Sequence, residues 1–91
     1  MPDGFFSIQT MFYVYIIQSQ INANLYKGMT SNLEDRLKQH NAGKTKTTKP
    51  FKPWRLIYFE EFDDRNQARA REKYFKSGAG RRYIREQLKI R

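Results

Sequence analysis

Residues 13–40 read YVYIIQSQINANLYKGMTSNLEDRLKQH, and this stretch decides the expected fold. The β-branched and aromatic run over 12–18 predicts a strand. It is apolar on both faces, which is typical of a central strand covered on both sides. Turn residues at 21–24 lead into a second strand over 25–28, which we expect to be antiparallel because the connection is too short for a crossover.

A short helix follows these strands. Ser31 and Glu34 have the spacing of a capping box, which predicts a helix that starts at Asn32. Residues 41–43, Asn-Ala-Gly, predict a left-handed stop at its end. Gly28 marks a place where the backbone bends or approaches another group closely.

The apolar stripe of this helix carries two polar residues. Leu33 and Leu37 lie one turn apart and are expected to face the core. Arg36 and His40 fall on the same stripe, so their side chains are directed toward the buried seam rather than toward solvent.

The remainder of the chain predicts a loop over 44–53, a third strand over 54–60 and two helices. Asp64, followed by Gln67, caps the first of these helices, and residues 77–80 end it. Residues 81–90 form the last helix. The order β-β-α-β-α-α predicts an α+β domain in which helices flank a small three-stranded antiparallel sheet.

Length and composition limit the classes of protein that are compatible with this chain. Its 91 residues fit one small domain, for which we expect residues 11–91 to fold behind a disordered lead-in at 1–10. The chain has no cysteine, which excludes a disulfide framework and a thiolate metal site. It has no membrane span and no signal-peptide pattern, so we expect a soluble cytoplasmic protein.

The charge indicates a polyanionic partner. Lys and Arg number 18 against 9 Asp and Glu, a net charge of +9, which favours nucleic acid over simple solvation of a small domain. One basic group lies on the loop around Phe51, where it could grip a backbone and stack a base; alternatively, the loop is simply exposed or Phe51 inserts into the core. The other basic group follows the last two helices, and only part of it can contact one strand. The expected nucleic-acid contacts are Lys27, Lys44, Lys46, Lys49, Phe51, Lys52, Lys76, Arg81 and Arg82.

Five polar residues are expected to converge at one edge of the core: Tyr15, Tyr26, Arg36, His40 and Glu72. This set suits phosphodiester hydrolysis. A guanidinium binds two phosphate oxygens and offsets the charge of the transition state. A lone carboxylate holds a hard divalent ion, and a phenol or imidazole moves the proton of the attacking water. Paired inward carboxylates are missing, so a two-metal site is not expected.

Each of these residues also has an ordinary structural interpretation. The two tyrosines could be strand aromatics with a hydroxyl at the surface. His40 could stabilise its helix C-terminus as a cation, and Arg36 could extend past the leucines into an ion pair. Glu72 could pair with Lys76 at i+4.

The spacing of these residues resembles the signature of the GIY-YIG nuclease superfamily. Tyr13-Val14-Tyr15, then ten residues, then Tyr26-Lys27-Gly28 is similar to the two half-motifs of that signature, and Arg36, His40 and Glu72 follow in its order. The likeness covers nearly the whole chain. It is closest to the short bacterial members and to the nuclease module of the excinuclease C subunit.

The resemblance implies a role for each residue of the signature. Tyr15 would be the general base or its partner, and Tyr26 would orient the attacking water. Arg36 would bind the scissile phosphate, and His40 would assist proton transfer. Glu72 would hold one ion, Mg²⁺ or Mn²⁺.

The chain departs from the family pattern at a few positions. Tyr13 replaces a glycine, Val14 and Lys27 replace isoleucines, and the late asparagine of some members is missing after Asn66. Lys27 either adds a phosphate contact or points away from the site.

The sequence therefore predicts a metal-dependent DNA endonuclease that acts on single-stranded, nicked or branched DNA in repair or recombination. The alternatives are a non-catalytic nucleic-acid-binding module and a nuclease subunit that needs a partner protein for targeting.

Overall fold

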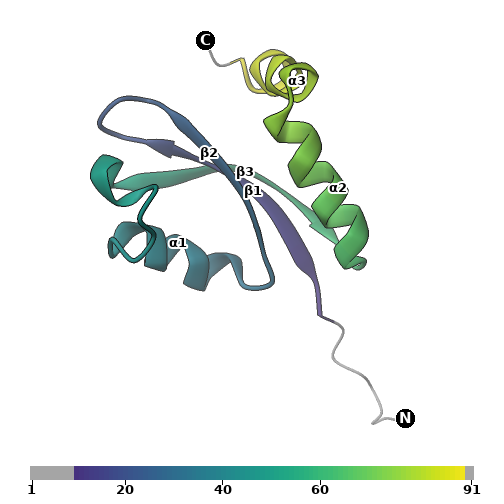
Figure 1. Ribbon diagram of the computed structural model, residues 1–91, viewed down its shortest axis with the longest axis horizontal. Helices are drawn as coiled ribbons and strands as arrows, with labels where there is room; N and C mark the ends of the chain where they lie inside the picture. Colours follow the sequence, from purple (N-terminus) through teal and green to yellow (C-terminus); the bar gives the residue numbers. More distant parts are fainter. Residues whose placement is uncertain (1–9, 90–91) are drawn as a thin grey trace, which may run out of the picture.

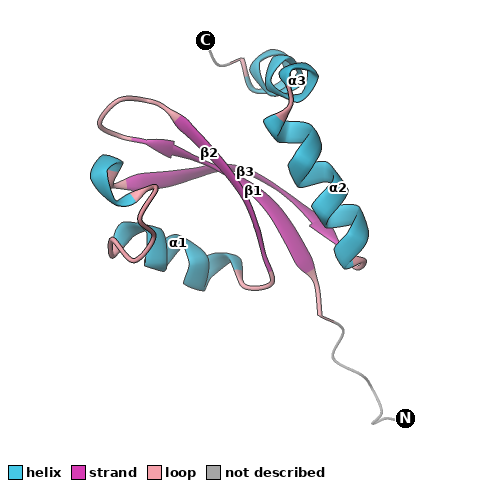
Figure 2. Cartoon of the chain, viewed as in Figure 1, coloured by secondary structure: helices cyan, strands magenta, loops and turns pink. Residues whose placement is uncertain are grey.

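The computed structural model describes residues 10–89, and the elements follow the predicted order β-β-α-β-α-α. A single turn of 3-10 helix, η1, interrupts the loop before the third strand (Figure 2). The elements are β1 Phe12–Ser19, β2 Leu25–Thr30, α1 Leu33–Asn41, η1 Lys49–Phe51, β3 Trp54–Phe62, α2 Arg65–Lys76 and α3 Gly78–Leu88. Residues 1–9 of the predicted lead-in at 1–10, and the predicted last residue of the third helix, Ile90, lie outside the described residues.

The sheet is antiparallel throughout, with the strand order β2-β1-β3, which confirms the central position of β1. Tyr15 on β1 pairs with Gly28 on β2. The register between β1 and β3 shifts at Ile16 and Ile17, where Ile57 is an extra residue on β3. Such a bulge increases the local twist, as expected for a small sheet covered on both faces.

The two faces of β1 are buried against different helices (Figure 1). Val14 and Ile16 pack on the side of α2 and α3, whereas Tyr15 and Ile17 pack on the side of α1. The alternation of strand side chains therefore divides the core into two clusters. No described helix is long and apolar enough to span a membrane.

The N-terminus of α1 corrects the predicted capping box. Asn32, rather than Ser31, is the N-cap, and its side-chain oxygen accepts a hydrogen bond of 3.0 Å from the Asp35 amide. The prediction at Ser31 is wrong by one residue because asparagine caps as well as serine does. At the other end Gly43 has φ +77°, which confirms the left-handed stop.

Asn41, the last residue of α1, joins this helix to the start of β3. Its Oδ1 accepts a hydrogen bond from the Trp54 amide at 2.6 Å, and its Nδ2 donates to the Trp54 carbonyl at 3.0 Å. The side-chain amide thus makes the pair of bonds that a neighbouring strand would make. The end of α1, and with it His40, is held against the sheet.

The junction between the last two helices differs from the prediction. Residues 77–80 were expected to end α2 as a loop, yet α3 already begins at Gly78, with Ser77 as its N-cap. The Ser77 hydroxyl accepts a hydrogen bond of 3.1 Å from the Gly80 amide. A Cβ at Gly80 would overlap with the Tyr74 carbonyl oxygen. Glycine is used here to let two helices meet closely, and not to break a helix.

Candidate active site

Tyr15 lies at the centre of the candidate site because of the glycine opposite it. Its side chain is almost fully buried on the α1 face of the sheet, and its phenol ring occupies the space that a Cβ of Gly28 would need. The absence of a side chain at Gly28 therefore lets the ring lie across β2, the edge strand of the sheet. The close approach predicted at Gly28 is confirmed.

His40 bonds directly to this tyrosine. It has 0% exposure, its Nε2 lies 2.8 Å from the Tyr15 hydroxyl, and its Nδ1 lies 2.8 Å from the Thr48 hydroxyl. The Thr48 hydroxyl in turn has the Thr45 carbonyl as an acceptor at 3.4 Å. Because that bond uses the threonine proton, Thr48 accepts from His40 Nδ1–H, and His40 Nε2 accepts from the tyrosine.

The protonation state of His40 follows from its surroundings. Burial lowers the pKa of its imidazole to about 4, with a further contribution from the positive charge of Arg36. His40 is therefore neutral near pH 7 and can accept a proton. The alternative in which it stabilises the helix end as a cation is wrong for this reason.

Arg36 completes the arrangement on the α1 side. Its Nε donates to the Tyr15 hydroxyl at 3.4 Å, and its Nη1 donates to Gln39 Oε1 at 2.8 Å. Burial raises the pKa of the Tyr15 hydroxyl, while the hydrogen bond and charge of Arg36 partly offset that rise. The tyrosine is thus protonated at rest beside a group that stabilises its phenolate.

Tyr26 packs against the same histidine. Its ring centroid lies 5.1 Å from that of His40 and 6.5 Å from that of Tyr15, in edge-on and tilted arrangements. Tyr26, Tyr15, His40 and Arg36 thus form one contiguous group on the α1 face.

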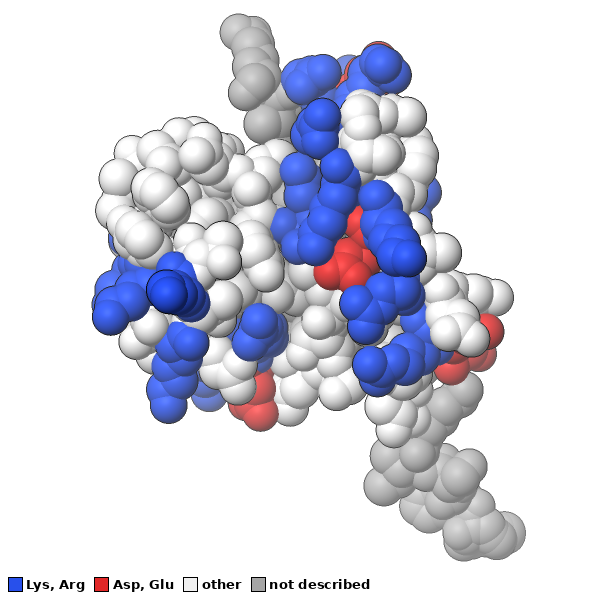
Figure 3. Space-filling view, in the orientation of Figure 1, with Lys and Arg blue, Asp and Glu red and all other residues white. Residues whose placement is uncertain are grey.

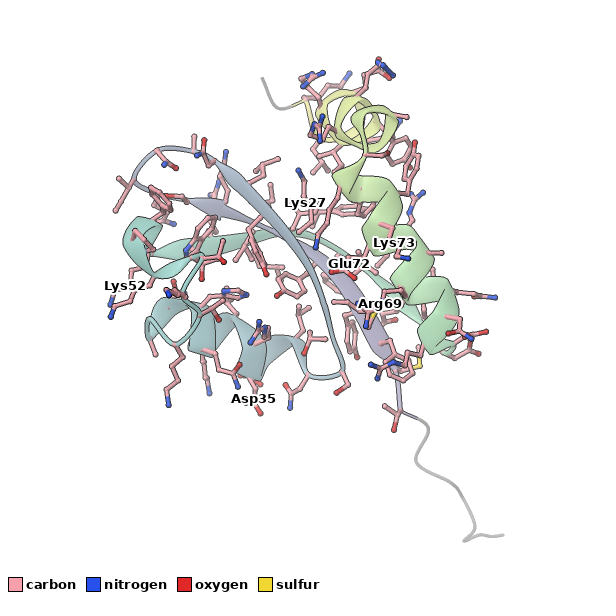
Figure 4. All side chains as sticks on the ribbon, in the orientation of Figure 1. Lys27, Asp35, Lys52, Arg69, Glu72 and Lys73 are labelled. Carbon is pink, nitrogen blue, oxygen red and sulfur yellow. The ribbon has the colours of Figure 1, made fainter. Side chains whose placement is uncertain are left out.

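Glu72 approaches from the other side of the sheet. It is 9% exposed and lies on the side of α2 that faces the sheet (Figure 4). Lys76 Nζ lies 3.1 Å from its Oε2 and Arg69 Nη1 lies 3.5 Å from its Oε1, so the ion pair with Lys76 that the spacing allowed is present. Its negative charge contributes to the raised pKa of Tyr15, although burial is the largest cause. The structure therefore brings four of the five predicted residues into contact and leaves Glu72 near them on α2.

Glu72 can accept a divalent ion on physical grounds. Among residues 10–89 no group of three or more His, Cys, Asp or Glu side chains is placed to hold a metal. Mg²⁺ does not require such a group, since it often binds through one carboxylate, several waters and substrate phosphates. The side chains of Arg69 and Lys76 are 49% and 52% exposed, so both can swing toward solvent and release the carboxylate.

Thr48 is the main site residue that the sequence analysis did not single out. It lies in a threonine-rich loop that reads as exposed, yet it is 1% exposed and bonds to His40. Its backbone carbonyl also accepts from the Trp54 indole at 2.8 Å. A single threonine among three in that loop carries no distinguishing pattern, so only the fold identifies it.

The predicted nucleic-acid contacts fall into two separate surfaces (Figure 3). The loop and η1 bring one group beside α1, and Phe51 there is 38% exposed, so the alternative in which it inserts into the core is wrong. The second surface follows α2 and α3. Lys27 belongs to it, because β2 directs this side chain to the face opposite Tyr26. The members of the first surface are Lys44, Lys46, Lys49, Phe51 and Lys52, and those of the second are Lys27, Lys76, Arg81 and Arg82.

Arg71 is basic but engaged within the fold. Its Nε lies 2.8 Å from Glu60 Oε1, and its guanidinium lies 4.6 Å from the Phe75 ring centroid and 5.0 Å from that of Tyr83. Glu60 also accepts a hydrogen bond from Tyr58. This cluster therefore stabilises the packing of α2 on β3 and is not available to a ligand.

Comparison with known proteins gives matches over most of the chain. A family model described as the GIY-YIG catalytic domain matches residues 11–84, which include all five candidate residues. A UPF0213 protein of Clostridium perfringens is 45% identical over 67 residues, covering 72% of this chain and 71% of its own. A UPF0213 protein of Pediococcus pentosaceus is 44% identical, covering 71% and 68%, and one of Haloquadratum walsbyi is 42% identical, covering 71% and 73%.

Proposed function

This chain belongs to the GIY-YIG family, and on that premise we propose that it is a metal-dependent endonuclease that hydrolyses DNA phosphodiester bonds. The observation that supports this most strongly is the buried, neutral His40 bonded to Tyr15 beside Arg36. A guanidinium, a phenol and an unprotonated imidazole within one hydrogen-bonded group are the components of acid–base catalysis at a phosphate.

The proton path in this proposal starts at Tyr15. The Tyr15 hydroxyl proton passes to His40 Nε2 in the same step in which the tyrosine oxygen takes a proton from the attacking water, so the low pKa of His40 need not generate a free phenolate. Arg36 stabilises the negative charge that develops on the tyrosine oxygen and contacts the scissile phosphate with the rest of its guanidinium. Tyr26 orients the water from the neighbouring strand.

Glu72 is the proposed ligand of one Mg²⁺ or Mn²⁺ ion, which would polarise the phosphate and stabilise the leaving oxygen. With an ion held by this carboxylate, Arg69 and Lys76 would lose their partner and would be available to the DNA backbone.

We propose single-stranded, nicked or branched DNA as the substrate, in repair or recombination in the cytoplasm. Support comes from the two separate basic surfaces, the loop beside α1 and the band over α2 and α3, which a flexible strand can contact together. A further protein could supply targeting.

The test is cleavage of labelled single-stranded, duplex, nicked and branched DNA with Mg²⁺ or Mn²⁺. Wild type is compared with Glu72→Gln, Arg36→Ala and the surface variant Lys38→Ala. We expect cleavage by wild type and Lys38→Ala, and loss of at least about a hundredfold in the two site variants with DNA binding retained. Equal loss of cleavage and binding in Glu72→Gln would assign Glu72 a structural role.

A non-catalytic binding module is the second candidate. The ion pairs of Glu72 with Arg69 and Lys76 favour it, because they occupy the carboxylate that would hold the metal. Binding of every DNA without cleavage by wild type would support this candidate or a subunit that needs a partner. Addition of metal to the free protein distinguishes the candidates, because a rise in Tm with Mg²⁺ that is lost in Glu72→Gln requires a metal ligand at Glu72.

A further inference from the structure

A cleft of about 340 Å³ lies between the β1–β2 turn and α3. It opens on the α2–α3 side of the sheet, away from His40 and Thr48. Leu25 and Ile84 supply apolar surface, and three cations surround them: Lys27, Arg81 and Arg85. The residues that line this cleft include no carboxylate.

Within the described part of the chain, no carboxylate pairs with these three cations. None of them forms an ion pair with a side chain of residues 10–89. Lys27 is half-buried, and burial lowers the pKa of its ammonium, with further contributions from Arg81 and Lys76. Solvation of exposed charges explains arginines on a surface, but it does not explain a lysine held in a cleft beside like charges. An anion is the partner that this geometry lacks.

A row of cations links the cleft to Glu72 of the candidate active site. Lys76 forms an ion pair with Glu72, and Arg81 lines the cleft. Lys27 lies close enough to both cations for their charges to lower its pKa. Figure 3 shows a band of Lys and Arg side chains over α2 and α3, with an acidic group enclosed in it. A polyanionic strand bound at Glu72 can therefore follow the band into the cleft.

We propose that this cleft binds one unpaired nucleotide of the substrate strand, next to the scissile phosphate. The phosphate of that nucleotide contacts Lys27, Arg81 and Arg85, and its base or sugar lies on Leu25 and Ile84. The volume is at the lower end of small-molecule pockets and suits one nucleotide, not a base pair. A base in a duplex must unstack to enter, whereas a base in a single strand enters at little cost. This inference rests on the proposed function and specifies its substrate as DNA with an unpaired nucleotide beside the cut.

The first experiment measures binding without metal, by fluorescence anisotropy of a labelled single-stranded oligonucleotide in EDTA. The test variant is Lys27→Met with Arg85→Gln, and the matched control is Lys38→Met with Arg55→Gln, which removes the same charges elsewhere. Arg81 is left unchanged because its Nη1 donates to the Lys76 carbonyl at 2.9 Å. We expect the test variant to bind about tenfold more weakly, with the salt slope lower by about 1. The control is expected to change affinity about threefold at most, and equal losses in both variants would overturn the proposal.

The second experiment tests the cleft itself. NMR spectra of methyl-labelled wild type are recorded with a 5′-phosphorylated thymidine dinucleotide. We expect the methyl signals of Leu25 and Ile84 to shift, and signals of Leu33 on the other face to stay in place. Unshifted cleft methyls at saturating dinucleotide would overturn the proposal.

The outcomes separate this inference from the proposed function. If wild type binds the dinucleotide in the cleft but cleaves no DNA, the proposed function fails and the nucleotide site stands. If wild type cleaves DNA and the cleft variant binds and cleaves like its matched control, the nucleotide site fails and the proposed function stands.

Discussion

At the scale of single residues, the site depends on one buried histidine and its two hydrogen bonds. His40 bonds to a tyrosine of β1 through Nε2 and to Thr48 of the loop through Nδ1. Both nitrogens are satisfied only in the tautomer that carries its proton on Nδ1. The residue is thus held neutral and oriented before any substrate binds.

The depressed pKa of His40 predicts a pH dependence of stability. Its pKa is about 4 in the folded protein, lowered by burial and Arg36, against an ordinary value of 6.5. Below pH 6.5 the unfolded chain binds a proton that the folded chain does not, so stability is lost as the pH falls. We expect the free energy of unfolding to decrease by about 2 kcal/mol between pH 7 and pH 5.

Urea unfolding at the two pH values measures this decrease. His40 is the only histidine in the chain, so His40→Gln serves as the control and is expected to show a much smaller decrease. The same slope in both proteins would contradict the assignment of the effect to His40.

Thr48 is predicted to act as a positioning residue. In Thr48→Val the His40 Nδ1–H loses its acceptor, which removes the preference for the tautomer with its proton on Nδ1. In the other tautomer the proton lies on Nε2, and this nitrogen can no longer accept a hydrogen bond from Tyr15. We expect kcat to fall about tenfold with little change in KM, and Thr48→Ser to restore it. ¹⁵N NMR of the imidazole reports the tautomer independently of activity. An unchanged tautomer in Thr48→Val would refute this role.

At the scale of elements, the close contact of α2 and α3 requires a glycine at position 80 but not at position 78. A Cβ at Gly80 would overlap with the Tyr74 carbonyl at the end of α2. A Cβ at Gly78, two residues earlier, would meet no heavy atom nearer than 4.0 Å. Gly80 is therefore needed for the packing of the two helices and Gly78 is not, although both lie in the first turn of α3.

Substitution of these glycines is expected to change stability in opposite directions. Gly80→Ala should destabilise the protein by about 3 kcal/mol or more, since backbone must move. Gly78→Ala should stabilise it by roughly 0.5–1 kcal/mol, because alanine favours the helix and restricts the unfolded chain. Thermal or urea unfolding of the two variants provides the measurement. A comparable loss in both would show that Gly78 has a contact that the structure does not contain.

At the scale of the whole molecule, the excess of positive charge is divided between two surfaces. The net charge is +9, but Arg71 is engaged with Glu60 and with aromatic rings. The loop surface beside α1 and the band over α2 and α3 are separated by uncharged surface in Figure 3. A strand that contacts both surfaces therefore spans the uncharged surface between them.

The loop surface is predicted to contribute to the salt dependence of DNA binding. Replacement of Lys44, Lys46 and Lys49 by glutamine should lower the salt slope for single-stranded DNA by up to about 2, since each phosphate contact contributes about 0.7. Affinity measured over a range of salt concentrations gives the slope. The control replaces Arg55, Arg65 and Lys89 by glutamine, and we expect its slope to stay near that of wild type. An unchanged slope in the loop variant would refute this contact.

The sequence by itself determined the order of the elements, the central strand and the residue set of the candidate site. Those conclusions depend on strand alternation, helix periodicity and motif spacing, which are properties of the local sequence. The cap at Asn32 and the start of α3 at Gly78 were missed, because neighbouring residues offer equally good caps and glycine both ends helices and permits close packing.

Only the tertiary structure decided how those residues act. The burial of Thr48, the neutral state of His40 and the position of Glu72 across the sheet depend on which elements pack together. The cleft beside Lys27 likewise forms only where the β1–β2 turn meets α3. Burial and electrostatic fields sum over residues that are distant in the sequence, so no local pattern contains them.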